Sequence, residues 1–244
     1  MPRNNPVALI TGGANGIGRA IARHLQATGW RIGVVDLPGN RLHLVFPRQA
    51  RNVVLVEGDV REQETVTRAV AALVERFGRI DALVSNAGIM IRKPLRRLTL
   101  AEWHKVIDTN LTAAFLFARA AEKQLRRAQG SIVSIASTRA FMSEPNTESY
   151  SASKGGLAAL THALAVSLGP DVRVNCVSPG WIETKNYGAL RRKDHTQHPG
   201  GPGRQASRHR RIVAWLLDRG RSGFVTGANF TVDGGMTRKM VYEE

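Results

Sequence analysis

The sequence of 244 residues contains a single cysteine, Cys176. One thiol cannot form a disulfide within the chain or supply a cysteine-based metal site. His195 and His198 resemble a metal-binding pair, but no third ligand accompanies them in the sequence, and we therefore expect no metal centre. Cys176 lies in an apolar run, where a free cysteine behaves as a small core residue.

Long hydrophobic runs are also absent. No stretch approaches the roughly 18 apolar residues that a membrane-spanning helix requires. The strand-like run beginning at Val7 follows the start of the sequence too closely to leave room for a signal peptide. We therefore expect no membrane segment and a cytoplasmic protein.

Acidic residues are scarce, with 19 Asp and Glu against 35 Lys and Arg, for a net charge of +16. Such a charge can indicate nucleic-acid binding. Here most basic residues are scattered, no basic stretch interleaves with aromatic residues, and no zinc-finger or RNA-binding motif occurs. We therefore expect a generally arginine-rich surface and no nucleic-acid partner.

What the sequence does contain is a regular alternation of short apolar runs and stretches with helical periodicity. The apolar runs predict strands at 7–10, 31–35, 53–56, 80–84, 131–135, 172–177 and 230–232. The periodic stretches predict helices at about 17–26, 62–77, from 99 onward and at 150–168. Fully apolar strands separated by helices indicate a parallel sheet that is covered on both faces. We expect a single α/β domain over 1–244, a Rossmann-type doubly wound parallel sheet.

A glycine-rich turn, Thr11 to Gly18, follows the first predicted strand and opens a helix. Glycines in this position let a pyrophosphate approach the backbone amides at the helix N-terminus. Arg19 stands where a mononucleotide-binding P-loop would need its Gly-Lys-Ser/Thr ending. The strand–turn–helix context therefore predicts dinucleotide binding.

Asp36 ends the second predicted strand, where a carboxylate can accept hydrogen bonds from the adenosine ribose hydroxyls. The same charge repels the 2′-phosphate of NADP, and the neighbouring residues Asn15 and Leu37 offer that phosphate no cation. A turn aspartate before Pro38 is the structural alternative. We expect NAD to be preferred over NADP.

Tyr150 and Lys154 are four residues apart on a predicted helix, so both side chains lie on one face. A tyrosine hydroxyl has a pKa of about 10, and lowering it to about 7 requires roughly 4 kcal/mol. A nearby ammonium group and a cofactor cation can supply this. Taken alone, the pair is more typical of a solvated helix surface than of an active site.

The whole set of motifs resembles the short-chain dehydrogenase/reductase family, in its compact, single-domain form. The resemblance extends from Val7 to Gly235, in the order and spacing of Thr11-x-x-x-Gly16-x-Gly18, Asn86-Ala87-Gly88, Asn110, Ser137, Tyr150-x-x-x-Lys154, Pro179-Gly180 and Val232-Asp233-Gly234-Gly235.

The resemblance implies a catalytic tetrad. Tyr150 would be the general acid/base, and Ser137 would hydrogen-bond the substrate oxygen. Lys154 would hold the nicotinamide ribose and lower the pKa of Tyr150. Asn110 would anchor a proton-relay water, although it could also be a polar break within a helix. The residues that the resemblance implies in cofactor binding are Gly12, Asn15, Gly16, Ile17, Gly18, Asp36, Asp59, Val60, Asn86, Ala87, Gly88, Tyr150, Lys154, Pro179, Gly180, Ile182 and Thr184.

The implied activity is NAD-dependent hydride transfer between the nicotinamide and a secondary alcohol or ketone, without a metal. The alternatives are an NADPH-linked 3-oxoacyl-carrier-protein reductase and a catalytically idle dinucleotide-binding scaffold. A polyol or sugar substrate is indicated by polar residues between Ser137 and Tyr150. The family resemblance also implies a homotetramer. Candidate substrate-pocket residues are Met90, Ile91, Arg92, Arg139, Glu144, Trp181 and Tyr187.

Residues 185–211 depart from the pattern, with eight basic and one acidic side chain and no hydrophobic periodicity. The segment follows the Pro179-Gly180 corner, and we expect it to form a substrate lid. Family members usually enter the last helix through an acidic stretch. Here that stretch is basic, which the helix dipole disfavours, and a short compensated reading-frame shift would explain the change.

Overall fold

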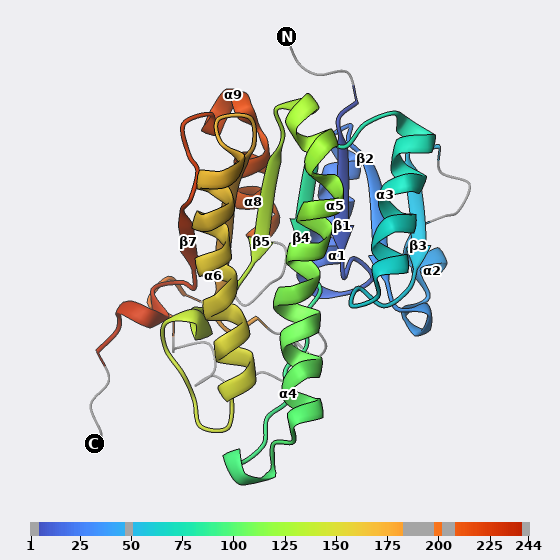
Figure 1. Cartoon of the computed structure of the whole chain (residues 1–244). Helices are drawn as coiled ribbons and strands as arrows, with labels where there is room; N and C mark the ends of the chain where they lie inside the picture. Colours follow the sequence, from blue (N-terminus) through green and yellow to red (C-terminus); the bar gives the residue numbers. More distant parts are fainter. Residues whose placement is uncertain (1–4, 47–50, 183–197, 202–207, 241–244) are drawn as a thin grey trace.

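A computed structural model describes residues 5–46, 51–182, 198–201 and 208–240 of the chain. Its strands form one sheet in the order β3-β2-β1-β4-β5-β6-β7, and every neighbouring pair is parallel (Figure 1). This confirms the predicted α/β class and the doubly wound sheet. The strands are β1 (Val7–Thr11), β2 (Arg31–Asp36), β3 (Val53–Glu57), β4 (Ala82–Ser85), β5 (Ser131–Ile135), β6 (Arg173–Pro179) and β7 (Asn229–Val232).

The helices cover both faces of the sheet and create two hydrophobic cores. One core lies under α3, α5 and α6, and the other lies under α1, α2 and α8. Strands buried on both faces need apolar side chains at successive positions, which explains the unbroken apolar runs in the sequence. The helices are α1 (Gly16–Ala27), α2 (Leu42–Val45), α3 (Gln63–Phe77), α4 (Leu100–Ile107), α5 (Ala113–Ala128), α6 (Glu148–Leu168), α8 (His209–Leu217) and α9 (Arg219–Ser222).

The long helix expected from Thr99 is interrupted in the structure. Its start is as predicted, because the Thr99 hydroxyl accepts a hydrogen bond from the backbone amide of Glu102 and the Glu102 carboxylate accepts one from Thr99. A π-helical turn, Asp108–Thr112, then separates α4 from α5. Such turns insert one residue into the helix and often occur at functional sites. In this protein the turn contains the buried Asn110.

The chain order places a switch point beside β1. β1 pairs with β2 on one side and with β4 on the other, so the connections leave it in opposite directions. In sheets of this kind, the loops at the carboxyl ends of the strands leave a crevice at the switch point. The glycine-rich turn after β1 and the Asn86–Gly88 segment after β4 meet at this place.

Several smaller expectations can be compared with the structure. Cys176 is fully buried in a small apolar cluster, as predicted, and Phe117 is a core residue on α5. Phe115 on the same helix is 43% exposed. Helix α8 begins at His209 with no acidic residue in its first turn, in agreement with the basic stretch in the sequence.

No helix of the described ranges is long and apolar enough to cross a membrane. Among the same residues, no group of three or more His, Cys, Asp and Glu side chains is arranged to hold a metal ion. Most of the expected lid, together with Thr184, Tyr187 and His195, lies outside the residues that the structure describes.

Candidate active site

A cavity of about 1000 Å³ opens at the carboxyl ends of the strands. Its volume is at the upper end of the range for small-molecule sites. The tetrad members Ser137, Tyr150 and Lys154 line it. Of the other predicted site residues, those that line the cavity are Gly12, Asn15, Gly16, Ile17, Asp36, Asp59, Val60, Asn86, Ala87, Gly88, Pro179, Gly180 and Ile182.

The glycine-rich loop is held from behind by Asn86. Its side-chain amide donates hydrogen bonds to the carbonyl oxygens of Thr11 (3.0 Å) and Gly12 (2.9 Å). The Thr11 hydroxyl in turn accepts from the backbone amides of Asn86 (3.0 Å) and Ala87 (3.1 Å). Asn86 therefore fixes the loop after β1 against the loop after β4, which is a role that its place in the sequence did not indicate.

Gly18 does not line the cavity but packs directly beneath the loop. A Cβ atom at this position would collide with the carbonyl oxygen of Gly12 and with the Asn86 side chain. Gly12 itself has φ +66°, in the left-handed region that favours glycine. The two glycines thus allow the loop and the start of α1 to approach closely.

We expect Gly18→Ala to weaken dinucleotide binding by about 5- to 150-fold, since overpacking of this kind costs about 1–3 kcal/mol and would displace the loop. The dissociation constant can be measured from the change in tryptophan fluorescence on titration. Gly39→Ala is the matched control, because an added Cβ there meets no atom within 4 Å. Unchanged binding by Gly18→Ala would contradict the close-packing argument.

Asp36 is buried at the end of β2 and is held by three hydrogen bonds. One carboxylate oxygen accepts from the backbone amide of Ala14 (2.8 Å), and the other accepts from the Leu37 amide (2.9 Å) and the Asn40 side chain (2.5 Å). These donors keep a negative charge at a defined place in the cavity wall. The arrangement fits the adenosine end of a dinucleotide.

Arg61, a cation that no sequence motif indicated, also lines this end of the cavity. Its guanidinium pairs with the Asp59 carboxylate, with 2.7 Å between Arg61 Nη2 and Asp59 Oδ2. The hydrogen bonds from Arg61 hold the pKa of Asp59 below its usual value. The charge of Arg61 is therefore compensated from within the protein.

The predicted tetrad comes together from two helical segments, α6 and the π-helical turn, and from the loop after β5. Lys154 Nζ on α6 donates to the carbonyl oxygen of Ile135 (2.8 Å) and lies 5.6 Å from the centre of the Tyr150 ring. The Ser137 hydroxyl, after β5, hydrogen-bonds the Tyr150 side chain. Asn110, in the π-helical turn, lies behind the cavity wall rather than in it.

The Asn110 side chain makes three hydrogen bonds with the protein. Its Nδ2 donates to the carbonyl oxygen of Ile89 (2.9 Å) and to Ser153 Oγ (2.9 Å), and its Oδ1 accepts from the Ile89 amide (2.8 Å). Ser153 Oγ donates to the Tyr150 carbonyl oxygen (2.7 Å). Asn110 therefore links the segment after β4 to the turn of α6 that carries Tyr150.

Burial dominates the electrostatics of the tetrad. It raises the pKa of the Tyr150 hydroxyl above its ordinary value, an effect opposed by the Ser137 hydrogen bond and by the charge of Arg139. Burial also lowers the pKa of the Lys154 ammonium from 10.5 to about 8. Desolvation thus outweighs the two groups that lower the pKa of Tyr150, and the lowering of this pKa by Lys154 together with a cofactor cation stays a prediction.

The low pKa of Lys154 makes folding stability depend on pH. Between about pH 8 and 10.5 the unfolded chain binds more protons at this residue than the folded chain, so its contribution to stability rises with pH. We expect the free energy of unfolding of the wild type to gain roughly 3 kcal/mol over this range relative to Lys154→Met.

Urea unfolding at a series of pH values measures this difference. Lys123→Met, which removes an exposed ammonium from α5, serves as the control and should leave the pH dependence of the wild type unchanged. Parallel curves for the wild type and Lys154→Met would contradict the lowered pKa.

The opposite end of the cavity is polar and contains a bridged pair of arginines. Glu144 forms ion pairs with both Arg92, after β4, and Arg139, after β5. Met90 and Trp181 line this end too, as predicted. Ile91 is not among the lining residues, which corrects the expectation that it belongs to the pocket.

Further lining residues were not anticipated from the sequence. Some are close neighbours of predicted residues in the chain and could have been found by extending those motifs. Only the fold brings three of them to the cavity: Lys105 from α4, Thr109 from the π-helical turn and Met236 from beyond β7. The unanticipated residues are Leu37, Asn40, Gly58, Arg61, Ile89, Lys105, Thr109, Ile135, Ala136, Thr138, Met142, Ser143 and Met236.

A parallel sheet with a glycine-rich loop at its switch point, and a buried lysine beside a tyrosine and a serine in the same cavity, define a dinucleotide-dependent oxidoreductase. A family model described as enoyl-(acyl carrier protein) reductase matches residues 12–237. The chain belongs to the short-chain dehydrogenase/reductase family, an enzyme family that binds nicotinamide dinucleotide cofactors.

Similar proteins support this assignment over the full length of the chain. An uncharacterized oxidoreductase of Thermotoga maritima is 43% identical, covering 98% of each chain. A trans-4-hydroxycyclohexanecarboxylate dehydrogenase of Sinomonas cyclohexanicum is 36% identical, covering 95% of this chain and 92% of that protein. An apo SCOR enzyme of Clostridium thermocellum superposes with a TM-score of 0.91 at 36% identity, covering 98% of this chain and 95% of the other.

Proposed function

We propose that this protein is an NAD-dependent dehydrogenase or ketone reductase that acts on a polar secondary alcohol or the corresponding ketone. The observation that carries the proposal is the grouping of Ser137, Tyr150 and Lys154 in the cavity that Asp36 also lines. The proposal assigns proton transfer to Tyr150 and cofactor selection to Asp36, and both residues line this cavity. In the proposed reaction Ser137 and Tyr150 polarise the substrate oxygen, so that hydride transfer between the cofactor and the substrate needs no metal.

The family's nicotinamide cofactor, when bound, supplies the hydride acceptor or donor. The residues proposed to hold it are those of the loop after β1, Asp36, Asp59-Val60, Asn86 to Gly88 and the Pro179–Ile182 corner, with Thr184 beyond. The close approach of Gly88 to Asn110 and Lys154 supports this fit: a Cβ at Gly88 would lie 3.3 Å from Asn110 Oδ1 and 3.4 Å from Lys154 Nζ.

In the oxidative direction, the Tyr150 oxygen takes the proton of the substrate hydroxyl, and in the reductive direction it returns it. Ser137 donates a hydrogen bond to the same substrate oxygen and holds it against Tyr150. Lys154 supplies a positive charge beside the tyrosine when protonated and orients the cofactor ribose. Asn110 acts through its hydrogen bonds to Ser153 and Ile89, and we assign it a positioning role in addition to the proton relay implied by the family.

The proposed preference for NAD rests on Asp36. Its carboxylate is fixed by three donors, so it cannot turn away from a 2′-phosphate without losing them. Among the described residues, Arg61 is the guanidinium that lines the cavity near Asp59, and it is already paired with the Asp59 carboxylate. The cavity wall at this end thus favours two ribose hydroxyls over a ribose phosphate.

The polar substrate is supported by the charged triad of Arg92, Arg139 and Glu144 at the far end of the cavity. These groups can hydrogen-bond the hydroxyls of a polyol or sugar, the substrate class we propose. The name of the Sinomonas relative, trans-4-hydroxycyclohexanecarboxylate dehydrogenase, describes a polar secondary alcohol as well.

Two alternatives are less well supported. An NADPH-linked 3-oxoacyl-carrier-protein reductase would have to place a phosphate against Asp36. An idle scaffold would not need Ser137, Tyr150 and Lys154 to converge. The homotetramer and the cytoplasmic location stay predictions.

The test is a screen of the purified chain against sugars, polyols, hydroxy acids and acyl thioesters with NAD(H) and NADP(H), followed at 340 nm. We expect turnover with NAD and one or more sugars, polyols or other polar secondary alcohols. Turnover of acyl thioesters alone, with NADPH, would favour the reductase alternative. Cofactor binding without turnover of any substrate would favour the scaffold.

A further inference from the structure

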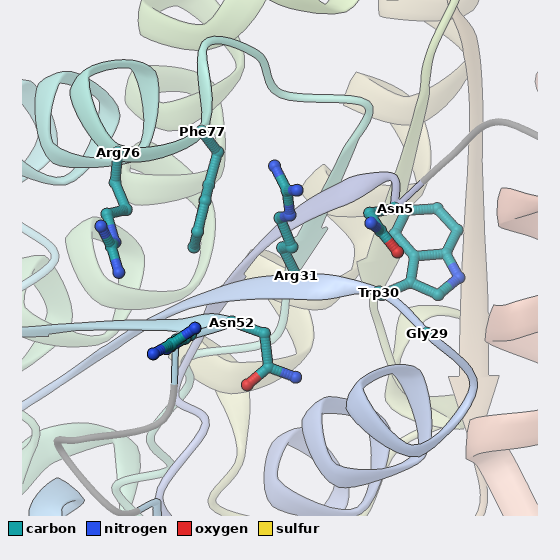
Figure 2. Close-up of a pocket in the computed structure, with 8 residues that line it drawn as sticks. Asn5, Gly29, Trp30, Arg31, Asn52, Arg76 and Phe77 are labelled. Carbon is teal, nitrogen blue, oxygen red and sulfur yellow. The ribbon is translucent and has the colours of Figure 1, made fainter.

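A second cavity, of about 370 Å³, lies at the opposite end of the sheet from the active site. It opens where β2 and β3 begin and where α3 ends, beside Asn5 (Figure 2). It shares no lining residue with the active-site cavity. Its lining residues are Asn5, Gly29, Trp30, Arg31, Arg51, Asn52, Arg76 and Phe77.

Three of these eight residues are arginines, and none is acidic. Arg31 comes from the start of β2, Arg51 from the turn before β3 and Arg76 from the last turn of α3. Within the described part of the chain, none of the three forms an ion pair. Other arginines on this protein, such as Arg79 and Arg126, pair with carboxylates.

The arrangement around Phe77 holds one of the cations in place. The guanidinium of Arg31 lies over the Phe77 ring, 5.5 Å from its centre, and is half-buried. In Figure 2 the Phe77 ring lies between the side chains of Arg31 and Arg76. Because Arg31 is stacked in this way, it cannot leave the cluster as freely as an exposed arginine could.

Three like charges around one hollow repel one another, and the repulsion is relieved when an anion binds between them. Guanidinium groups present forked donors that match the oxygens of phosphate. Asn52 adds to this set, because its side-chain oxygen accepts from Gln26 (3.3 Å) while its amide N–H groups donate to no acceptor in the described residues. Trp30 and Phe77 provide flat apolar walls beside the cations.

We propose that this cavity, which we call the arginine cleft, is a binding site for a small anion that carries two or more phosphate groups. Its volume suits a compact ligand such as pyrophosphate or a nucleoside diphosphate. The site is separate from the proposed dehydrogenase centre and does not depend on that function.

Isothermal titration of the full chain with pyrophosphate and with ADP tests the proposal. Saturating NAD is present throughout, so that neither ligand is measured at the cofactor site. We expect one saturable site per chain for each ligand. Arg51→Ala and Arg76→Ala should each weaken binding by about tenfold or more, as expected for the loss of a charge-assisted hydrogen bond.

Arg127→Ala is the matched control. Arg127 is exposed and lies in the last turn of α5, as Arg76 lies in the last turn of α3, but it is outside the arginine cleft. We expect it to bind both ligands like the wild type. Because the substituted side chains are exposed, the thermal midpoints of the variants should match that of the wild type and show that they are folded.

Comparison of pyrophosphate with ADP shows whether the site recognises the phosphate groups alone or a whole nucleotide. Equal affinities would support a site for the phosphate groups alone, and tighter binding of ADP would support a nucleotide whose base stacks on the aromatic walls. Absence of saturable binding of both ligands would overturn the proposal. Equal weakening by Arg127→Ala and Arg76→Ala would overturn it too, since binding would then follow the overall positive charge.

Discussion

Replacing Tyr150 by phenylalanine should reduce turnover by at least ~100-fold, the lower limit for removal of a general acid/base. The variant keeps the aromatic ring beside Lys154 but loses the hydroxyl that Ser137 hydrogen-bonds. Cofactor affinity should change little, because the loop after β1 and Asp36 are untouched. Steady-state kinetics with a substrate identified by the screen, together with fluorescence titration of NAD, measures both quantities.

A hydroxyl in the same turn of α6 supplies the control for this experiment. Ser151→Ala removes a side chain that bonds Ser143 and Thr147 and does not line the active-site cavity. Its turnover should stay close to that of the wild type. If Tyr150→Phe also kept near wild-type turnover, another residue would have to be the proton donor and the proposed mechanism would be wrong.

Removing the carboxylate of Asp36 should reduce the preference of the enzyme for NAD over NADP. Like charges brought together cost several kcal/mol, so we expect the wild type to prefer NAD over NADP by at least about 100-fold in kcat/KM. Asp36→Ala should narrow that ratio by about tenfold or more. The variant also leaves the amides of Ala14 and Leu37 without their acceptor, so both cofactors will bind less well. The ratio, measured on one substrate, is therefore the informative quantity.

Asn40→Ala distinguishes the effect of the Asp36 charge from the effect of the loop geometry around it. It removes one hydrogen-bond donor to the Asp36 carboxylate but leaves the negative charge in place. We expect the preference for NAD to persist in this variant. A wild type that prefers NADP would exclude the role assigned to Asp36, and an Asn40→Ala effect as large as that of Asp36→Ala would mean that loop geometry selects the cofactor.

Much of the fold was predictable because it depends on local patterns. Each predicted strand lies within two residues of the observed one, since parallel strands that are buried on both faces are rich in apolar side chains. The helix start at Thr99 was also predictable, because the capping box that sets it joins residues only three positions apart. The π-helical turn around Asn110 was not predictable, because it depends on hydrogen bonds to Ile89 and Ser153, which are distant in the sequence.

The candidate site also has parts that could be predicted from local sequence and parts that could not. Motifs within a few residues of one another, such as the glycine-rich loop and the Tyr150–Lys154 pair, could be interpreted from the sequence because a turn or one helical face positions them. The bridging of Arg92 and Arg139 by Glu144 depends on two loops that meet only in the folded chain. The hydrogen bonds from Asn86 to the glycine-rich loop likewise depend on two loops that meet only in the folded chain.

The sequence by itself determined the order of the strands and helices, the loop that follows β1 and the spacing of the tetrad, because each depends on periodicity or on neighbouring residues. Only the tertiary structure decided which charges are compensated. Burial lowers the pKa of Lys154, Asp59 neutralises Arg61, and the arginine cleft gathers three cations from three separate segments. Electrostatic energies depend on distances and on solvent exposure, and both are set when these segments pack together.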